Sequence, residues 1–381
     1  MPDLPPDPNN QRVDARIGES RPLFDATIER FEDLEVLRAQ WEAVEGIPVF
    51  VDQRDEGVDH SWGGVDVRTL LRGEQSGGRF SSHSVQLAPG ASVPVHYHVD
   101  AHTYLLVVDG RVHLQIGDLV ERVGKHSVGY APPRTHVGVE NRSGQPAVVA
   151  LTYSPAGADR AFAAAHQHER MTGTAAADDA HAILARYGFR FDGAPLENDA
   201  RTNAVEPPVD IAFEGGDDLE RIRRAFFART AVPRLVATNR DEYSPATMDE
   251  TLRKQLLTGD DSAGTAMMNM VSLAPGPPVD PHHQPTEDEF FFVTEGPAEL
   301  TCGADTRIVG AGAIAYCPRN CTHGFRNPNP SARMQFVTLN SPAGHERALV
   351  ALRKALADGM PTDELTALSI AGGWRNHVPY E

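Results

Sequence analysis

The sequence predicts a mostly β protein of two tandem β-barrels, with helical segments at the N-terminus, between the barrels and at the C-terminus. One observation behind this prediction is an internal repeat, in which a pattern of glycines, histidines and strand-like hydrophobic runs occurs twice, 186 residues apart. A second is the content of 33 Gly and 29 Pro, which suits a turn-rich β architecture. Because solenoid units repeat every ~20 to 50 residues, the much longer period indicates two duplicated domains.

The two copies of the repeat share a glycine, two ligand-type residues, a second glycine and a later histidine. In the first copy these are Gly90, His96, His98, Gly110 and His136. In the second copy they are Gly276, His282, Gln284, Gly296 and His323. The flanking segments agree as well, because residues 84–90 match 270–276 and residues 154–157 match 341–344.

These residues resemble the cupin superfamily, whose motifs are G-x5-H-x-H-x3-4-E-x6-G and G-x5-P-x-G-x2-H-x3-N. The second half keeps the motif glutamate as Glu289 but has Gln284 in place of the second histidine. The first half keeps both histidines and has Thr103 where the glutamate belongs. The resemblance covers residues 60–155 and 240–341, and it implies two cupin barrels, each a double-stranded β-helix of the jelly-roll type.

Two metal sites follow from the motifs. His96 and His98 alternate along a predicted strand, so both side chains leave the same face and can reach a common ion together with His136. The ligand candidates of the second half are His282, Gln284, Glu289 and His323. Histidine nitrogen with at most one carboxylate favours Fe(II), which we expect, or Ni, Mn, Co or Zn, over Ca or a thiolate cluster.

Several neighbouring residues remain open as alternatives. His102 precedes the glutamate position by one residue and can ligate if the strand shifts register, whereas His283 can replace His282 if the loop is one residue shorter. The proton acceptor is not identified, and Glu140 and Tyr104 are candidates only because they lie near the motifs.

The resemblance implies an enzyme that uses the metal. Gentisate 1,2-dioxygenase-like and quercetin 2,3-dioxygenase-like cupins are similar in being bicupins, which predicts an Fe(II) dioxygenase that inserts O2 into a chelating enol, phenol or hydroxy-acid and cleaves it. Three neutral histidines leave the ion its full charge and favour an anionic substrate, so we expect the first barrel to be catalytic. The opposite allocation stays open, because a triad containing Glu289 is itself a competent oxygenase arrangement. Two other functions also stay open: an oxalate decarboxylase-like enzyme or isomerase without O2 chemistry, and a non-catalytic binding bicupin.

Composition restricts the partners. The formal net charge of −18 argues against nucleic acid and against an anionic membrane surface. No apolar run approaches the ~20 residues of a spanning helix, and the first residues lack the features of a signal peptide. We therefore expect a cytoplasmic protein whose partners are a small-molecule substrate and O2, and the sequence leaves homo-oligomer formation open.

The predicted division of the chain follows the repeat. Residues 1–50 form an N-terminal arm and helix, 51–155 barrel one, 156–235 a helical appendage and linker, 236–341 barrel two, and 342–381 C-terminal helices. Apolar residues at helical spacing predict a helix within 25–45, and shorter helices are predicted at 160–167, 178–188, 219–229, 343–357 and 363–371.

Overall fold

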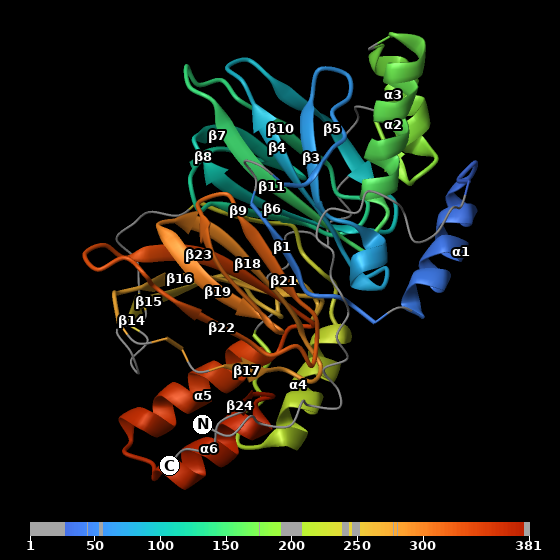
Figure 1. The fold of residues 1–381 in the computed structure, drawn as a ribbon. Coiled ribbons are helices and arrows are strands. Elements are labelled where there is room, and N and C mark those ends of the chain that lie inside the picture. Colours follow the sequence, from blue (N-terminus) through green and yellow to red (C-terminus); the bar gives the residue numbers. More distant parts are fainter. Residues whose placement is uncertain are drawn as a thin grey trace.

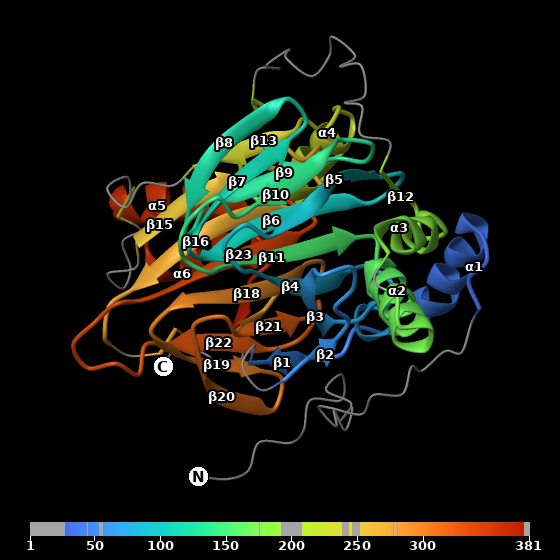
Figure 2. The ribbon, with the colours of Figure 1, turned by 90° about the horizontal axis from the view of Figure 1, so that it is seen from above.

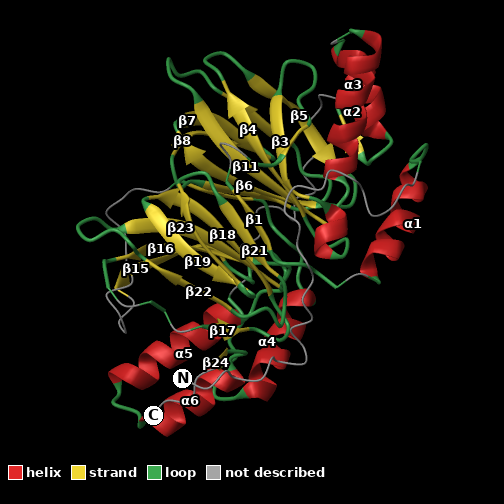
Figure 3. Cartoon of the chain, viewed as in Figure 1, coloured by secondary structure: helices red, strands yellow, loops and turns green. Residues whose placement is uncertain are grey.

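The structure is a computed structural model, and it describes residues 27–43, 45–52, 56–174, 176–191, 208–237, 244–245, 252–276, 278–279 and 281–376. The predicted N-terminal lead and most of the predicted linker lie outside the described residues. Two β-barrels are stacked on one another, and helices lie at their outer ends (Figure 1; Figure 3). The predicted mostly β fold with two tandem jelly-roll barrels is confirmed.

Barrel one consists of a seven-stranded and a five-stranded antiparallel sheet. The larger sheet has the order β13-β9-β6-β11-β4-β3-β2. Its strands are β2 (Val58–Asp59), β3 (Asp66–Leu71), β4 (Ser81–Leu87), β6 (His102–Asp109), β9 (Val128–Ala131), β11 (Ala147–Ser154) and β13 (Arg234–Val236). The smaller sheet, β12-β5-β10-β7-β8, contains β5 (Ser92–His98), β7 (Arg111–Ile116), β8 (Leu119–Gly124), β10 (Val137–Glu140) and β12 (Phe189–Arg190).

Barrel two repeats this arrangement. Its larger sheet, β1-β21-β18-β23-β16-β15-β14, contains β1 (Val49–Val51), β14 (Ser244–Pro245), β15 (Leu252–Leu257), β16 (Met267–Leu273), β18 (Asp288–Glu295), β21 (Ile314–Cys317) and β23 (Met334–Ser341). Its smaller sheet, β20-β19-β22-β17-β24, contains β17 (His282–His283), β19 (Pro297–Cys302), β20 (Asp305–Gly310), β22 (His323–Arg326) and β24 (Arg375–Asn376). The two barrels differ most in one strand, because β17 has two residues where the equivalent β5 has seven.

The helices lie where hydrophobic spacing predicted them, within a few residues at each end. They are α1 (Phe31–Glu42), α2 (Ala158–Thr172), α3 (Ala177–Ala185), α4 (Gly216–Phe227), α5 (His345–Ala357) and α6 (Thr362–Ala371), with a 3-10 turn, η1, at Gly73–Ser76. In α1 the predicted apolar stripe is buried at Leu34, Leu37 and Trp41. Across the described residues, every helix is too short or too polar to cross a lipid bilayer.

The two barrels exchange edge strands. β1 precedes the strands of barrel one but pairs with β21 of barrel two, and β13 precedes those of barrel two but pairs with β9 of barrel one. The exchange is anchored by apolar side chains: Phe50 is buried in the interior of barrel two, and Leu235 packs against the core of barrel one. The domain boundaries that the sequence predicted, at residues 50 and 235, therefore fall within the exchanged strands β1 and β13.

The repeat extends to the helices before each barrel. In α1, Arg38 donates a hydrogen bond from Nε to the carbonyl of Ala156 at 2.5 Å. In α4, Arg223 donates from Nε to the carbonyl of Ala343 at 3.0 Å. The duplicated unit therefore begins with these helices, and α4, which the sequence division assigned to the linker, is the counterpart of α1.

An apolar interface joins the two larger sheets, and a buried carboxylate lies within it. Asp288 is fully buried and accepts hydrogen bonds from Arg79 Nε and Nη2 at 2.7 and 3.1 Å, across the boundary between the barrels. It also accepts from Tyr316 Oη at 3.2 Å and from Arg319 N and Nη2 at 3.1 and 2.9 Å. A buried carboxylate must be paired to be tolerated, and here five donors satisfy it.

Substituting Asp288 should destabilise the whole chain. Asp288→Asn keeps the shape but removes the charge that pairs with Arg79 and Arg319, and breaking a buried ion pair at one partner costs about 3 kcal/mol. Urea unfolding followed by circular dichroism measures the free energy of unfolding. The control is Glu220→Gln, which removes an exposed pair with Arg224 and should cost less than about 0.5 kcal/mol. Equal effects of the two variants would contradict the assigned role of Asp288.

Candidate metal centre

Barrel two brings together three of the predicted ligands. The ligand atoms of His282, Glu289 and His323 all lie within 4.8 Å of one another, and this is the one such group of three or more among the residues that the structure describes. His282 on β17 pairs directly with His323 on β22, and their ring centroids are 4.6 Å apart. Glu289 reaches them from β18 on the opposite sheet, so the site spans the interior of the barrel.

Contacts around His323 fix the orientation of its ring. Its Nδ1 lies 2.9 Å from the carbonyl oxygen of Cys321, to which it donates a hydrogen bond, so Nε2 is directed toward the centre. There Nε2 lies 2.9 Å from Glu289 Oε2, although no hydrogen bond of good geometry satisfies it. A buried nitrogen that lacks such a partner is what a metal ligand requires.

The pKa values of the pair respond to this contact. Burial would raise the pKa of Glu289, but the short contact with His323 and its charge, followed by the charge of His282, outweigh it and lower the pKa to about 2. Burial would likewise lower the pKa of His323, but the contact with Glu289 raises it. Glu289 is therefore an anion at neutral pH, as a carboxylate ligand must be.

Gln284 completes the set. It is buried, its Nε2 donates a hydrogen bond to Glu289 Oε2 at 3.2 Å, and its Oε1 is buried without a partner. Its backbone carbonyl accepts from the backbone nitrogen of Asn320 at 2.8 Å, which ties it to the loop before His323. Asn320 has a positive φ of 63°, which asparagine tolerates, and this explains how it replaces the glycine of the motif.

The donor set fits a first-row transition metal. Two imidazoles and one carboxylate are the ligands of a mononuclear Fe(II) site, and the unpartnered amide oxygen of Gln284 is available as a fourth. The buried Nε2 of His323 and Oε1 of Gln284 are both explained if an ion lies between them. His282, Glu289 and His323 are therefore brought together, and Gln284 joins them through its contact with Glu289.

The histidines of barrel one do not converge in this way. His96 and His98 are buried on one face, as the alternation predicted. His98 Nδ1 accepts a hydrogen bond from Ala101 N at 3.0 Å, and the ring also hydrogen-bonds the backbone of Tyr187. His136 lies against the ring of Tyr97 at 5.2 Å. Among the described residues these three histidines do not form a group within ligand distance.

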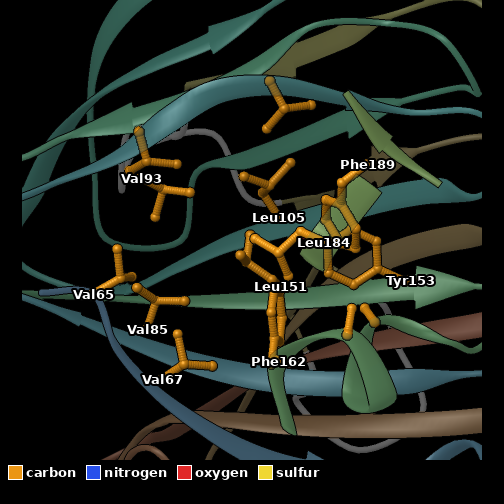
Figure 4. Close-up of a cluster of buried hydrophobic side chains, with 14 of the residues drawn as sticks. Val65, Val67, Val85, Val93, Leu105, Leu151, Tyr153, Phe162, Leu184 and Phe189 are labelled. Carbon is orange, nitrogen blue, oxygen red and sulfur yellow. The ribbon is translucent and has the colours of Figure 1, made fainter. Parts of the chain in front are cut away.

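Aromatic side chains fill the interior of barrel one. Tyr153, Phe162 and Phe189 point toward one another with ring centroids 5.7 to 6.2 Å apart (Figure 4). His96 Nδ1 lies 2.8 Å from the carbonyl of Pro94, and the residual cavity beside the ring is only about 10 Å³. Thr103, in the place of Glu289, is also buried and offers no charge. The structure therefore favours the opposite allocation from the one we expected, with the metal centre in barrel two.

The equivalent positions in barrel two are polar. Asn340 stands directly opposite Glu289 in the β18–β23 pair, and its buried Nδ2 has no hydrogen-bond partner. The corresponding residue of barrel one is Tyr153, and Thr338 likewise replaces Leu151. Barrel two, which has the complete triad, thus has polar side chains at these positions. Barrel one, which lacks the glutamate, has larger and more apolar side chains there.

The structure corrects the two alternative histidines. His102 points away from the interior of barrel one: its Nδ1 lies 2.8 Å from Tyr130 Oη, and the two rings stack at the interface between the barrels. His283 follows His282 on β17, so its side chain takes the opposite face, and its cross-strand partner is Arg375. Neither shift of register occurs.

The two candidate proton acceptors also lie elsewhere. Glu140 is on the surface, where its carboxylate pairs with Arg142 at 2.5 Å. Tyr104 donates a hydrogen bond from Oη to Thr265 Oγ1 of the other repeat at 3.1 Å, and burial raises its pKa. Because Tyr104 follows Thr103 on β6, its side chain lies on the opposite face of the strand, at the interface between the barrels. Both assignments are corrected on this geometry.

Comparison with known proteins supports the fold. Residues 83–153 and 269–340 each match the Cupin domain family. Protein Ylba from E. coli aligns at a TM-score of 0.50 with 11% sequence identity, over 80% of this chain and 96% of that one. The chain has the bicupin fold. No curated protein matches the sequence.

Other bicupins of known structure align less closely. Oxalate decarboxylase from Bacillus subtilis has a TM-score of 0.48 and 14% identity, over 87% of this chain and 88% of its own. Oxalate decarboxylase from Lactobacillus farciminis has a TM-score of 0.48 and 12% identity, over 85% and 96%. Likenesses at this identity concern the fold, and the activity of this bicupin depends on the residues of its own site.

Sequence reasoning missed a buried cluster beside the centre. Glu287 is buried and forms an ion pair with Arg223 of α4, and its second oxygen lies 3.4 Å from His345 Nδ1 of α5. The ring of His345 lies against Trp374, 3.9 Å between centroids, just before β24 pairs with the ligand strand β17. The first repeat has a related contact, in which Arg38, the counterpart of Arg223, forms an ion pair with Asp100, the residue that aligns with Thr286.

Metal content should depend on barrel two alone. The purified protein should hold about one equivalent of a first-row transition metal, because one complete ligand set is assembled. Glu289→Gln, which replaces the anionic ligand by a neutral isostere, should remove most of it, as measured by elemental analysis. The matched control in the other repeat is His96→Ala, which should leave the content unchanged. Loss of metal in the control with retention in Glu289→Gln would reverse the allocation.

The metal-free protein should show a pH dependence set by the Glu289–His323 pair. The lowered pKa of Glu289 adds stability above its usual value of 4.5, which is lost as the pH falls toward about 2. The raised pKa of His323 adds stability that is complete below 6.5 and lost as the pH rises through the folded pKa. The Glu289–His323 pair therefore contributes most to the stability of the protein between pH 4.5 and pH 6.5.

The test is urea unfolding of chelator-treated protein at about pH 5.5 and about pH 8. The wild type should lose more stability over this interval than Glu289→Gln, because the variant has lost the partner that raises the pKa of His323. An equal loss in both proteins would show that this pair does not set the dependence.

Proposed function

We propose that this bicupin is a metal-dependent dioxygenase with its catalytic centre in barrel two, held by His282, Glu289 and His323 with Gln284 beside them. The observation that supports the proposal is the assembled set of two histidines and one carboxylate, which is typical of non-haem Fe(II) oxygenases. The proposed substrate is a small oxygenated molecule that chelates through two oxygens, such as an enol, a phenol or a hydroxy-acid, and the second reactant is O2.

The metal supplies the open coordination positions at which a chelating substrate and O2 are brought together. The protein supplies the charge balance, because Glu289 is held as an anion by His323 and contributes one negative charge to the site. Gln284 donates a hydrogen bond to the same carboxylate oxygen, Oε2, at 3.2 Å. Both contacts fix the position of Glu289 before any ligand arrives, which avoids reorganisation during reaction.

The walls of the site have separate roles. Asn340, opposite Glu289, carries a buried Nδ2 that can donate a hydrogen bond to a substrate oxygen. Farther along the same two strands the wall is apolar: the ring of Phe291 on β18 lies 5.7 Å from that of His323, and Phe336 on β23 packs against Phe291 at 5.5 Å. An apolar wall lowers the local dielectric and strengthens the interaction between the charges of the site.

Side chains from α5 and from the segment after α6 lie beside the site. His345 and Trp374 pack on one another next to the strand that carries His282, and His345 is buried. The ion pair of Glu287 with Arg223 ties α4 to the strand that carries Glu289. The ion pair and the ring contact therefore hold α4 and α5 against this side of the site.

Oxygen consumption tests the proposal. Protein loaded with Fe(II) should consume one O2 per substrate in an oxygen electrode, with both labelled oxygen atoms in the product, for at least one member of a panel of flavonols, gentisate-like phenols and 1,3-diketones. Glu289→Gln should reduce turnover by at least ~100-fold, because loss of a ligand costs metal affinity or activity of this order or more. His96→Ala is the matched control and should retain activity. Conversion without oxygen uptake would refute the dioxygenase and support a decarboxylase or isomerase.

A further inference from the structure

A polar groove lies between α5 and the strands β15 and β16. Figures 1 and 2 both show α5 alongside this edge of barrel two. The groove has a volume of about 220 Å³, and its polar lining comes from Arg253, Lys254, Gln255, Asn269, Glu346 and Arg353. We call it the basic groove. It is separate from the metal centre, whose ligands do not line it.

The charge of the groove is opposite to that of the chain. The chain has a formal net charge of −18, whereas three cations and one carboxylate line the groove. That carboxylate, Glu346, is engaged by the backbone: its Oε1 accepts from Gly259 N at 2.7 Å and its Oε2 from Gly344 N at 2.8 Å. Glu346 thus holds the start of α5 in place, and among the described residues that line the groove the basic side chains outnumber the acidic one.

Arg353 is the least compensated of these cations. Its side chain is partly buried, and it forms no ion pair with any residue that the structure describes. Burial lowers the pKa of its guanidinium. A planar guanidinium at the wall of a cavity is suited to bind a carboxylate or phosphate through two parallel hydrogen bonds.

In the first repeat this region lacks the two arginines, because Val67 and His166 stand where barrel two has Arg253 and Arg353, while Arg68 and Asp159 keep the charges of Lys254 and Glu346. Arg253 pairs with Val271, and the equivalent pair in barrel one is Val67 with Val85. Phe162 stands where Leu349 lines the groove, and it packs on Trp62 at 6.2 Å in a cavity of only about 10 Å³. In barrel two, Leu349 and Arg253 therefore line an open groove, whereas the equivalent Phe162 and Val67 of barrel one are closely packed.

Asn269 adds a second type of donor. It lies on β16 opposite Gln255 of β15, so both amides are directed to the same side of the sheet as Arg253. Asn269 is buried, and its Nδ2 makes a weak contact with the sulfur of Met267 at 3.8 Å. The cations and the amides thus surround a space that is large enough for a small ligand.

We propose that the basic groove binds the oxyanion of a small molecule, a carboxylate or a phosphate, through the guanidinium groups of Arg353 and Arg253. Asn269 and Gln255 donate further hydrogen bonds from the sheet. The site is separate from the metal ligands and does not depend on them. It is adjacent to the centre, because His345 experiences the charges of both Arg253 and Glu289.

Isothermal titration of the full-length protein with malonate, inorganic phosphate and the neutral malonamide tests the proposal. At least one of the two anions should bind, and malonamide should not. Whichever of malonate and phosphate binds more tightly shows whether the groove prefers a carboxylate or a phosphate. Arg353→Gln should weaken binding at least ~10-fold, since hydrogen bonds between charged groups have this strength. Arg353→Lys should retain part of the affinity, because the charge remains while the paired hydrogen bonds are lost.

Two control variants distinguish binding in the groove from a general effect of charge and from binding at the metal. Lys354→Gln removes one positive charge from an exposed position on the same helix and should leave binding unchanged. Glu289→Gln should lose metal but keep the anion. The proposal is refuted if neither anion binds, if Arg353→Gln and Lys354→Gln bind as the wild type does, or if anion binding disappears with the metal in Glu289→Gln. If Arg353→Gln fails to fold, Arg253→Gln provides the same comparison.

Discussion

The buried carboxylate of Asp288 connects the features on which the candidate centre depends. It lies immediately before Glu289 on β18, it is bound by Arg319 in the loop that leads to His323, and it is bound by Arg79 from the other barrel. A charge in the interior needs compensation from every side, so these three segments cannot move apart without exposing it to an apolar environment. The relative position of two metal ligands is thereby linked to the packing of the two barrels.

Duplication has given two barrels with one backbone plan and different interiors. Barrel one contains Tyr153, Phe162 and Phe189 in contact, and its volume is used for packing. At the corresponding positions barrel two has Asn340, Leu349 and Trp374, so that the residue opposite Glu289 is polar where barrel one has Tyr153. Well-packed apolar interiors stabilise a domain, whereas polar groups that await a ligand do not. We infer that barrel one and the exchanged strands provide stability that barrel two gives up to form its site.

The sequence predicted the repeat and the helices because each depends on local patterns: alternation in strands, helical spacing, and glycines at the turns. Gly110 is an example, since its φ of 78° and the carbonyl of Pro146, 2.6 Å from where a Cβ would lie, leave no room for a side chain. The jelly-roll topology of the barrels came from the resemblance to the cupin superfamily. The motif also identified His282, Glu289 and His323. It did not separate them from His96, His98 and His136, because both sets have the same spacing along the chain.

The sequence by itself determined which residues could be ligands and on which face of a strand each would lie. Only the tertiary structure decided which set converges, because convergence depends on contacts between segments far apart: His98 is held by the backbone near Tyr187, while His323 faces Glu289 across the barrel. The exchange of β1 and β13 and the basic groove under α5 have the same origin. Pairing between distant strands and the charge left uncompensated in a cavity are properties of the packed molecule, and no local pattern specifies them.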